Sequence, residues 1–275
     1  LSTILFSCEK DDVDTMNSNG IPSYINIPNF ILDDEDTTHN ITDAWVYINE
    51  QLQGVYELPV EIPILANKEQ NLRIKAGIKI NGISATRSAY PYYSSYIDES
   101  FVFESGKTTT IVPVVSYTDS AKSRLYVENF EPENNSSGYS IENTNNSDTV
   151  FEVINEGTNH YAIGALSDSI SLFEITNIEG FSELPSGNHP VFIELLYKNN
   201  TRFQIGLYIN KDEAVEVAEL IWVAPKDEWS KIYVNITNII NSNLSANSFK
   251  VFIKMERDFD LSENYIYFDN LKLVY

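Results

Sequence analysis

The chain has 275 residues, of which 43% are hydrophobic and 12% aromatic. This length is enough for two domains that each bury a core, and the composition excludes an intrinsically disordered protein. With 40 acidic and 18 basic residues the formal net charge is -22, which repels phosphate and disfavours nucleic acid as a partner. The acidity fits either cation binding or a solvated exterior, and we favour the solvated exterior.

The first seven residues are mostly apolar and lead into Cys8, the single cysteine of the chain. One cysteine excludes an intramolecular disulfide. The run ending in Ser7-Cys8 resembles a bacterial lipobox, with residues 1–7 as the remnant of a signal peptide. Lys10, Asp11 and Asp12 follow and resemble the lipoprotein export signal of Bacteroidetes.

The lipobox resemblance implies that Cys8 carries acyl chains that anchor the chain in the outer membrane, and the export-signal resemblance implies display on the cell surface. The alternative is an unmodified cysteine after a hydrophobic strand. Residues 8–40 are polar and acidic, with Asp33-Asp34-Glu35-Asp36, and we expect them to form a lipidated tether.

Residues 41–118 consist of short alternating runs rich in Val, Ile, Tyr and Phe, which predict a small β-sandwich. Asn81-Gly82 suits a tight turn, so we expect 70–80 and 83–93 to pair antiparallel. The segment 45–49, together with Gly54, Pro59 and 72–77, resembles PEGA-type or related immunoglobulin-like surface domains. That resemblance implies a spacer or attachment module and no chemistry.

Residues 119–124 are predicted to be a linker, and 125–275 contain further strand-like runs of about six residues. We expect residues 237–243 to form a short helix, and 213–220 an outer strand or loop. Glu-Asn-Phe-Glu at 128–131 and Tyr-Phe-Asp-Asn-Leu at 267–271 resemble the galactose-binding-like jelly roll of many carbohydrate-binding modules. The resemblance implies that the first and last strands of this domain lie side by side.

No residue pattern predicts catalysis. His39, His160 and His189 have no spacing that suggests a metal site or a catalytic triad, and no phosphate-binding loop or nucleophile elbow is present. We therefore expect a protein that is not an enzyme and has no catalytic residues.

The jelly-roll resemblance implies a structural calcium where the first and last strands meet. Glu128, Glu131 and Asp269 are the matching positions, and carboxylate oxygens are the ligands that Ca²⁺ prefers. The alternative is that these carboxylates only keep a strand edge solvated.

Sugar binding needs aromatic faces beside amides and carboxylates. Two groups of residues supply them, and in both the alternative is core packing. The first group lies around Pro91, where alternation predicts that some rings are exposed, and the second flanks 224–228. The predicted ligand-binding residues are Tyr90, Tyr92, Tyr93, Tyr96, Trp222 and Trp229.

The sequence thus predicts an all-β protein with two β-sandwich domains, the second a jelly roll. The function we expect is non-catalytic binding of polysaccharide or glycoconjugate at the cell surface. The alternative is a structural accessory subunit of an outer-membrane complex for glycan uptake or secretion, in which the aromatic side chains contact protein.

Overall fold

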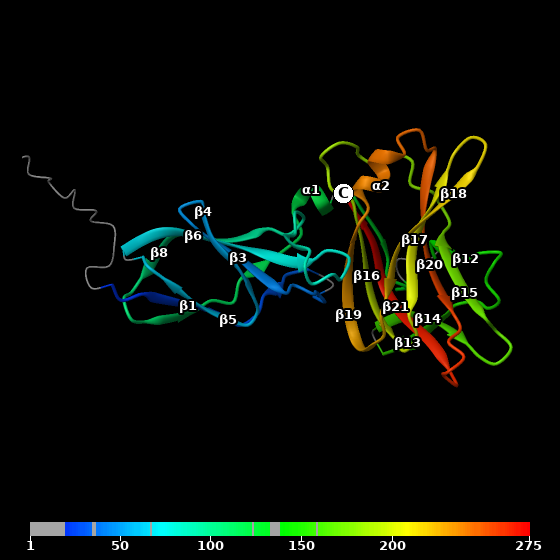
Figure 1. Cartoon of the computed structure of the whole chain (residues 1–275), viewed down its shortest axis with the longest axis horizontal. Helices are drawn as coiled ribbons and strands as arrows, with labels where there is room; N and C mark the ends of the chain where they lie inside the picture. Colours follow the sequence, from blue (N-terminus) through cyan, green and yellow to red (C-terminus); the bar gives the residue numbers. More distant parts are fainter. Residues whose placement is uncertain (1–19, 35–36, 67, 123, 133–137, 158) are drawn as a thin grey trace, which may run out of the picture.

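A computed structural model describes residues 20–34, 37–66, 68–122, 124–132, 138–157 and 159–275. Strands dominate these residues, which confirms the predicted all-β fold class (Figure 1). In the described ranges no helix is long and apolar enough to cross a membrane. Cys8, Lys10, Asp11 and Asp12 lie outside the described residues, so the anchor and the export signal remain predictions.

The N-terminal unit is a β-sandwich with its own hydrophobic core. Its larger sheet has the order β4-β3-β6-β7 with β8 also paired to β6, and two small sheets, β5-β1-β9 and β10-β2, complete it. A short helix, α1 (Asp119–Lys122), occupies the predicted linker. The strands are β1 (Ser23–Ile27), β2 (Ile31–Leu32), β3 (Asp43–Ile48), β4 (Gln51–Glu57), β5 (Val60–Ile64), β6 (Lys68–Lys79), β7 (Arg87–Ala89), β8 (Ser95–Phe103), β9 (Thr108–Thr110) and β10 (Val114–Val115).

The predicted tether is wrong from Ser23 onward. β1 pairs with β5 and β9, and Ile25 and Ile27 are fully buried in the core of the N-terminal unit. The alternation of Tyr24-Ile25-Asn26-Ile27 is that of a half-buried strand, and it outweighs the polar composition around it.

The C-terminal unit is a sandwich of two antiparallel sheets, with orders β13-β14-β21-β16-β19 and β12-β15-β20-β17-β18. β11 pairs antiparallel with β21, which confirms that the first and last strands lie side by side. The predicted short helix is α2 (Thr237–Ser242). The strands are β11 (Leu125–Glu128), β12 (Ile141–Asn143), β13 (Glu152–Glu156), β14 (Asn159–Leu166), β15 (Leu172–Asn177), β16 (Phe192–Asn199), β17 (Phe203–Asn210), β18 (Val215–Val223), β19 (Lys226–Asn235), β20 (Ser248–Glu256) and β21 (Asn264–Val274).

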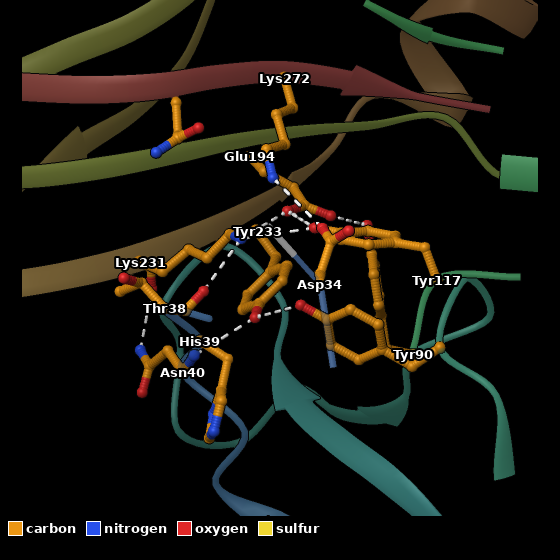
Figure 2. Close-up of polar contacts among 12 residues, drawn as sticks. Asp34, Thr38, His39, Asn40, Tyr90, Tyr117, Glu194, Lys231, Tyr233 and Lys272 are labelled. Atoms are coloured by element: carbon orange, nitrogen blue, oxygen red, sulfur yellow. Dashed lines mark hydrogen bonds and ion pairs between the residues drawn. The ribbon is translucent and has the colours of Figure 1, made fainter. Parts of the chain in front are cut away.

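A buried ion pair lies where the two units meet. The side chains of Glu194 and Lys231 are both 0% exposed, with 3.1 Å between Glu194 Oε2 and Lys231 Nζ. Tyr90 and Tyr117 of the N-terminal unit donate their hydroxyls to Glu194, and Lys231 Nζ donates to the Thr38 carbonyl at 3.2 Å (Figure 2). The tyrosine hydroxyls therefore take the place of water around the carboxylate of an ion pair that belongs to the other unit.

The Asn81-Gly82 turn takes part in the same contact. Both residues have positive φ, as predicted, and β6 pairs antiparallel with β7. The second strand resumes only at Arg87, so the predicted two-residue hairpin is wrong. Asn81 N–H donates to the Tyr233 carbonyl at 2.8 Å, and the longer loop provides this contact with β19.

Candidate functional site

The outward face of the β12-β15-β20-β17-β18 sheet carries an unusual mixture of groups. Phe203, Ile205 and Leu207 of β17 are fully buried in the sandwich core, so the residues between them point outward. The strand register sets Gln204 of β17 opposite Trp222 of β18. An aromatic ring and an amide therefore lie next to each other on one surface, which we call the outer face.

Lys254 of β20 lies between Gln204 and Glu174 across three strands of the outer face. Its ammonium is 2.6 Å from Glu256 Oε1, in a pair whose side chains are 23% and 52% exposed. The charge of Lys254 is therefore compensated by Glu256 at the end of β20.

Glu174 is a nearly buried carboxylate on the outer face, 4% exposed. Its Oε1 accepts hydrogen bonds from Thr144 Oγ1 and from the Tyr208 hydroxyl, both at 2.6 Å. In the described part of the chain every hydrogen bond to this carboxylate goes to Oε1, so Oε2 is left to accept one from a ligand. Burial, and then the bond to Glu174, raises the pKa of Tyr208 well above its usual value, so this hydroxyl stays a donor.

Tyr208 borders an open hollow of about 330 Å³ on the outer face. Amides and hydroxyls dominate its wall, so it offers donors and acceptors to a polyhydroxylated ligand. The lining residues are Glu142, Asn143, Thr144, Asn145, Thr176, Tyr208, Asn210, Val215 and Lys250.

Gln204 is the most informative residue of the outer face. It is 1% exposed, and among the described residues neither its amide nitrogen nor its amide oxygen has a hydrogen-bond partner. Leaving such a group unsatisfied costs about 1–3 kcal/mol, so native proteins rarely keep one without a use. Trp222 beside it is 41% exposed, and the Arg202 guanidinium lies 4.9 Å from the centre of its ring.

An apolar strip joins Gln204 to the hollow. A Cβ at Gly206 would collide with the ring of Phe252, so glycine lets this ring lie flat across β17. The Tyr208 ring packs on Phe252 with 4.9 Å between centroids. The outer face therefore has polar groups at both ends and aromatic rings between them.

A second hollow of about 310 Å³ lies in the N-terminal unit and is lined by Asn49, Gln51, Gln53, Gln70 and aliphatic side chains. Its amides bond to each other, with Asn49 Nδ2 donating to Gln70 Oε1 at 3.1 Å. No aromatic side chain lines this hollow. It is the weaker candidate, because it lacks a ring on which a ligand could stack.

Alternation predicted that some rings of the tyrosine cluster are exposed, and in the structure three of the four are buried. Tyr90, Tyr92 and Tyr93 are 3%, 8% and 6% exposed, and Tyr96 is half-buried. The ring of Tyr90 lies 5.2 Å from Phe192 of the C-terminal unit. The rings that could not all fit one small core fill the contact between two units, where they cannot stack on a ligand.

The two tryptophans are not brought together. Trp222 belongs to β18 and points from the outer face, whereas Trp229 belongs to β19 of the opposite sheet. Trp229 is 37% exposed and lies 5.3 Å from the ring of Tyr161 and 6.4 Å from that of Tyr267. Because the chain crosses between sheets at 224–225, neighbours in sequence face opposite sides of the sandwich.

The three predicted calcium ligands have other partners. Glu128 accepts hydrogen bonds from Phe130 N–H at 2.9 Å and from Ser140 N–H at 2.6 Å. Glu131 pairs with His160, and Asp269 accepts from Asn270 N–H. Across the described ranges no group of three or more His, Cys, Asp or Glu residues could hold a metal ion, so calcium binding stays a prediction.

Sequence reasoning missed Glu174, Gln204 and Tyr208. The signal for the last two was available, because period-2 alternation along residues 202–209 sets both on one face of a strand. The partners of Glu174 come from 144–146 and from β17, and their proximity depends on strand order.

No protein-family model matches the chain, and no curated protein matches its sequence. A xylan-binding domain of carbohydrate-binding module family 22 is 16% identical and has a TM-score of 0.38, covering 54% of this chain and 92% of that chain. A family 29 carbohydrate-binding module is 16% identical with a TM-score of 0.35, covering 55% and 87%.

The third similar structure contains the CBM22-1 and GH10 modules of a Clostridium thermocellum endo-1,4-β-D-xylanase complexed with xylohexaose. It is 15% identical with a TM-score of 0.36, covering 54% of this chain and 27% of that chain. This chain therefore spans about a quarter of the length of that structure. At these TM-scores the similarity carries no argument about the ligand, and the function is inferred from the outer face itself.

Proposed function

We propose that the outer face of the β12-β15-β20-β17-β18 sheet binds a polysaccharide or glycoconjugate without catalysing a reaction on it. Gln204 carries the proposal, because its buried amide lacks partners in the described part of the chain, and a ligand rich in hydroxyls would supply them once the side chains over it move aside. Trp222 supplies an exposed ring beside it for stacking on a sugar.

The spacing of the groups favours a chain of sugars over a single ring. Gln204 and Tyr208 are four residues apart on β17, which is about 13 Å along a strand. A ligand that contacts Trp222 at one end and the hollow at the other must cover this length. Glu174 Oε2 would accept a hydroxyl between them.

The proposed function is tested by exchanging Gln204 for leucine. Gln204→Leu removes an unsatisfied buried amide, so we expect the free energy of unfolding to rise by about 1 kcal/mol or more. The same variant should bind less strongly, by about tenfold, to any glycan that the wild-type chain retains on a glycan array. Gain of stability with loss of binding marks a functional group and not a structural one.

Gln53→Leu is the comparison variant, since this exposed glutamine lines the second hollow in the N-terminal unit. If the ligand binds the outer face and not that hollow, Gln53→Leu should change neither quantity. Absence of binding to every glycan on the array would overturn the proposal. Unaltered affinity of Gln204→Leu would remove Gln204 from the site.

We propose further that Cys8 is acylated and holds the chain at the outer membrane with the outer face displayed on the cell surface. The support is the apolar run before Cys8 and the acidic residues after it. A polysaccharide outside the cell would then reach the outer face without crossing a membrane.

An accessory role in a protein complex is the second candidate, favoured by one observation. Trp229, Tyr161, Tyr265 and Tyr267 form a partly exposed group of rings on the sheet opposite the outer face. Tyrosine and tryptophan commonly anchor protein contacts. A chain that binds no glycan but loses a complex partner on Trp229→Ala would favour this role.

A further inference from the structure

β18 is an edge strand that is regular and little protected from Val215 to Glu219, before the register shift against β17 that falls between Glu219 and Ile221. It runs for nine residues, Val215–Val223, and pairs on one side with β17. It contains no proline, lysine or arginine, and Val215 and Val217 are 59% and 57% exposed. Such a strand presents unpaired backbone N–H and C=O groups together with apolar side chains, which is a template for another strand.

The other edges of the C-terminal unit are protected. The N-terminal unit covers the backbone of β19 from Lys231 to Tyr233, with Asn40 Nδ2 donating to the Lys231 carbonyl at 2.9 Å and Asn81 N–H to the Tyr233 carbonyl at 2.8 Å, and the exposed Lys226 opens the strand. β12 has three residues, and β13 has five with a glutamate at each end. Among the edges of the C-terminal unit, β18 is therefore the one at which pairing costs least.

We infer that β18 pairs antiparallel with β18 of a second copy of this chain. The sequence of β18 is self-complementary for a two-fold dimer. When the axis passes through Val217 or Ala218, Glu216 and Glu219 each lie opposite an apolar residue and never opposite a glutamate. Like charges directly opposite destabilise a sheet, so these registers avoid the main penalty of pairing a strand with itself.

The overall shape leaves room for this contact. β18 lies on the far side of the C-terminal unit from the N-terminal unit, so the latter does not cover it (Figure 1). Two five-stranded sheets would join into one continuous sheet. The two copies carry like net charge, and salt at physiological strength screens this repulsion beyond about 8 Å.

Pairing would also extend the proposed ligand face, a consequence that rests on the proposed function. Val215 lines the hollow and Trp222 lies on the same strand, so both sit beside the seam. A dimer would place two outer faces on one surface and could bind a long polysaccharide through both, which raises avidity without new contacts. The dimer is measured without any glycan, so a failure of the dimer can be told apart from a failure of the proposed glycan binding.

The inference is tested by analytical ultracentrifugation of the whole chain in reducing buffer, where Cys8 cannot cross-link. We expect wild type to form dimers, and Val217→Glu to raise the dimer dissociation constant by about tenfold or more. In both registers the new carboxylate lies opposite another carboxylate, either its own copy or Glu219 of the second chain, and like charges directly opposite destabilise a sheet. Val102→Glu is the matched control, because Val102 is 56% exposed on β8 of the N-terminal unit, and this variant should dimerise like wild type.

Position-specific cross-linking identifies the strand. In a Cys8→Ser background, Val217→Cys or Ala218→Cys should form an intermolecular disulfide, because residues at the two-fold axis have Cα atoms about 4.5–5.5 Å apart. Val102→Cys should not cross-link. A wild-type chain that stays monomeric, or a dimer that Val217→Glu leaves intact, would overturn the inference.

Discussion

Lys231→Met should weaken the coupling between the two units, so that they no longer unfold in one transition. The ammonium of Lys231 is 3.1 Å from Glu194 Oε2, and both side chains are 0% exposed. Methionine fills similar space but leaves the carboxylate buried without this cation. Removing one partner of a buried ion pair costs about 3–5 kcal/mol, and we expect the free energy of unfolding to fall by that amount.

The double variant Glu194→Leu with Lys231→Met tests whether the loss in free energy of unfolding comes from leaving the carboxylate unpaired. Without either charge the desolvation penalty disappears, and such replacements are commonly neutral or stabilising by about 1–4 kcal/mol. Here the Tyr90 and Tyr117 hydroxyls would lose their acceptor, at about 1–3 kcal/mol each. We therefore expect the double variant to lie between wild type and Lys231→Met.

Urea unfolding followed by circular dichroism measures these differences. Because Lys231 also donates to Thr38 of the N-terminal unit, loss of the pair should split one cooperative transition into two. Lys211→Met is the matched control, since Lys211 forms a surface pair with Glu216 at 2.7 Å and should cost less than about 1 kcal/mol. Equal losses for Lys231→Met and Lys211→Met would refute the reasoning.

Three further predictions concern Tyr233, the predicted calcium ligands and Cys8. Burial raises the pKa of Tyr233 to about 12. In the unfolded state this hydroxyl loses its proton near pH 10, so the free energy of unfolding is unaffected below that pH. Above pH 10 it falls by up to about 1.4 kcal/mol per pH unit. A urea midpoint that stays constant from about pH 9 to about pH 11 would contradict this. If Glu128, Glu131 and Asp269 belong to a calcium site, calcium at 100-fold excess over its Kd should stabilise the chain by about 2.7 kcal/mol relative to chelator, whereas equal melting curves leave only the strand-edge role. Cys8→Ala should move the protein from washed outer membranes to the soluble fraction, and a variant retained there would argue against the anchor.

Local pattern was enough to predict much of the fold. Alternating apolar residues gave most strands of the C-terminal unit, and β11 pairs with β21 as the motifs at 128–131 and 267–271 implied. β14 was missed because Ala162, Gly164 and Ala165 give it little strand character. Its glycine is required by the Phe173 ring that occupies the space of a Cβ, which is a tertiary constraint and leaves no local signal.

The candidate site was harder to predict because it depends on contacts between distant segments. The tyrosines near Pro91 contain too many rings for one small core, but their partners Phe192 and Tyr233 lie about a hundred residues or more further along the chain. Trp222 was identified from its ring, whereas the partner that makes it informative is Gln204 on the neighbouring strand. Pairing between strands decides which residues share a face, and composition does not record it.

The most direct test of the ligand face is isothermal titration calorimetry with a glycan that the wild-type chain binds, using Trp222→Ala and Trp229→Ala. The two tryptophans are similarly exposed, at 41% and 37%, but lie on opposite sheets. Our account predicts that Trp222→Ala weakens binding by about 3- to 10-fold through loss of ring stacking, and that Trp229→Ala binds like wild type. Unchanged affinity for Trp222→Ala together with loss for Trp229→Ala would contradict it and place the ligand on the opposite sheet.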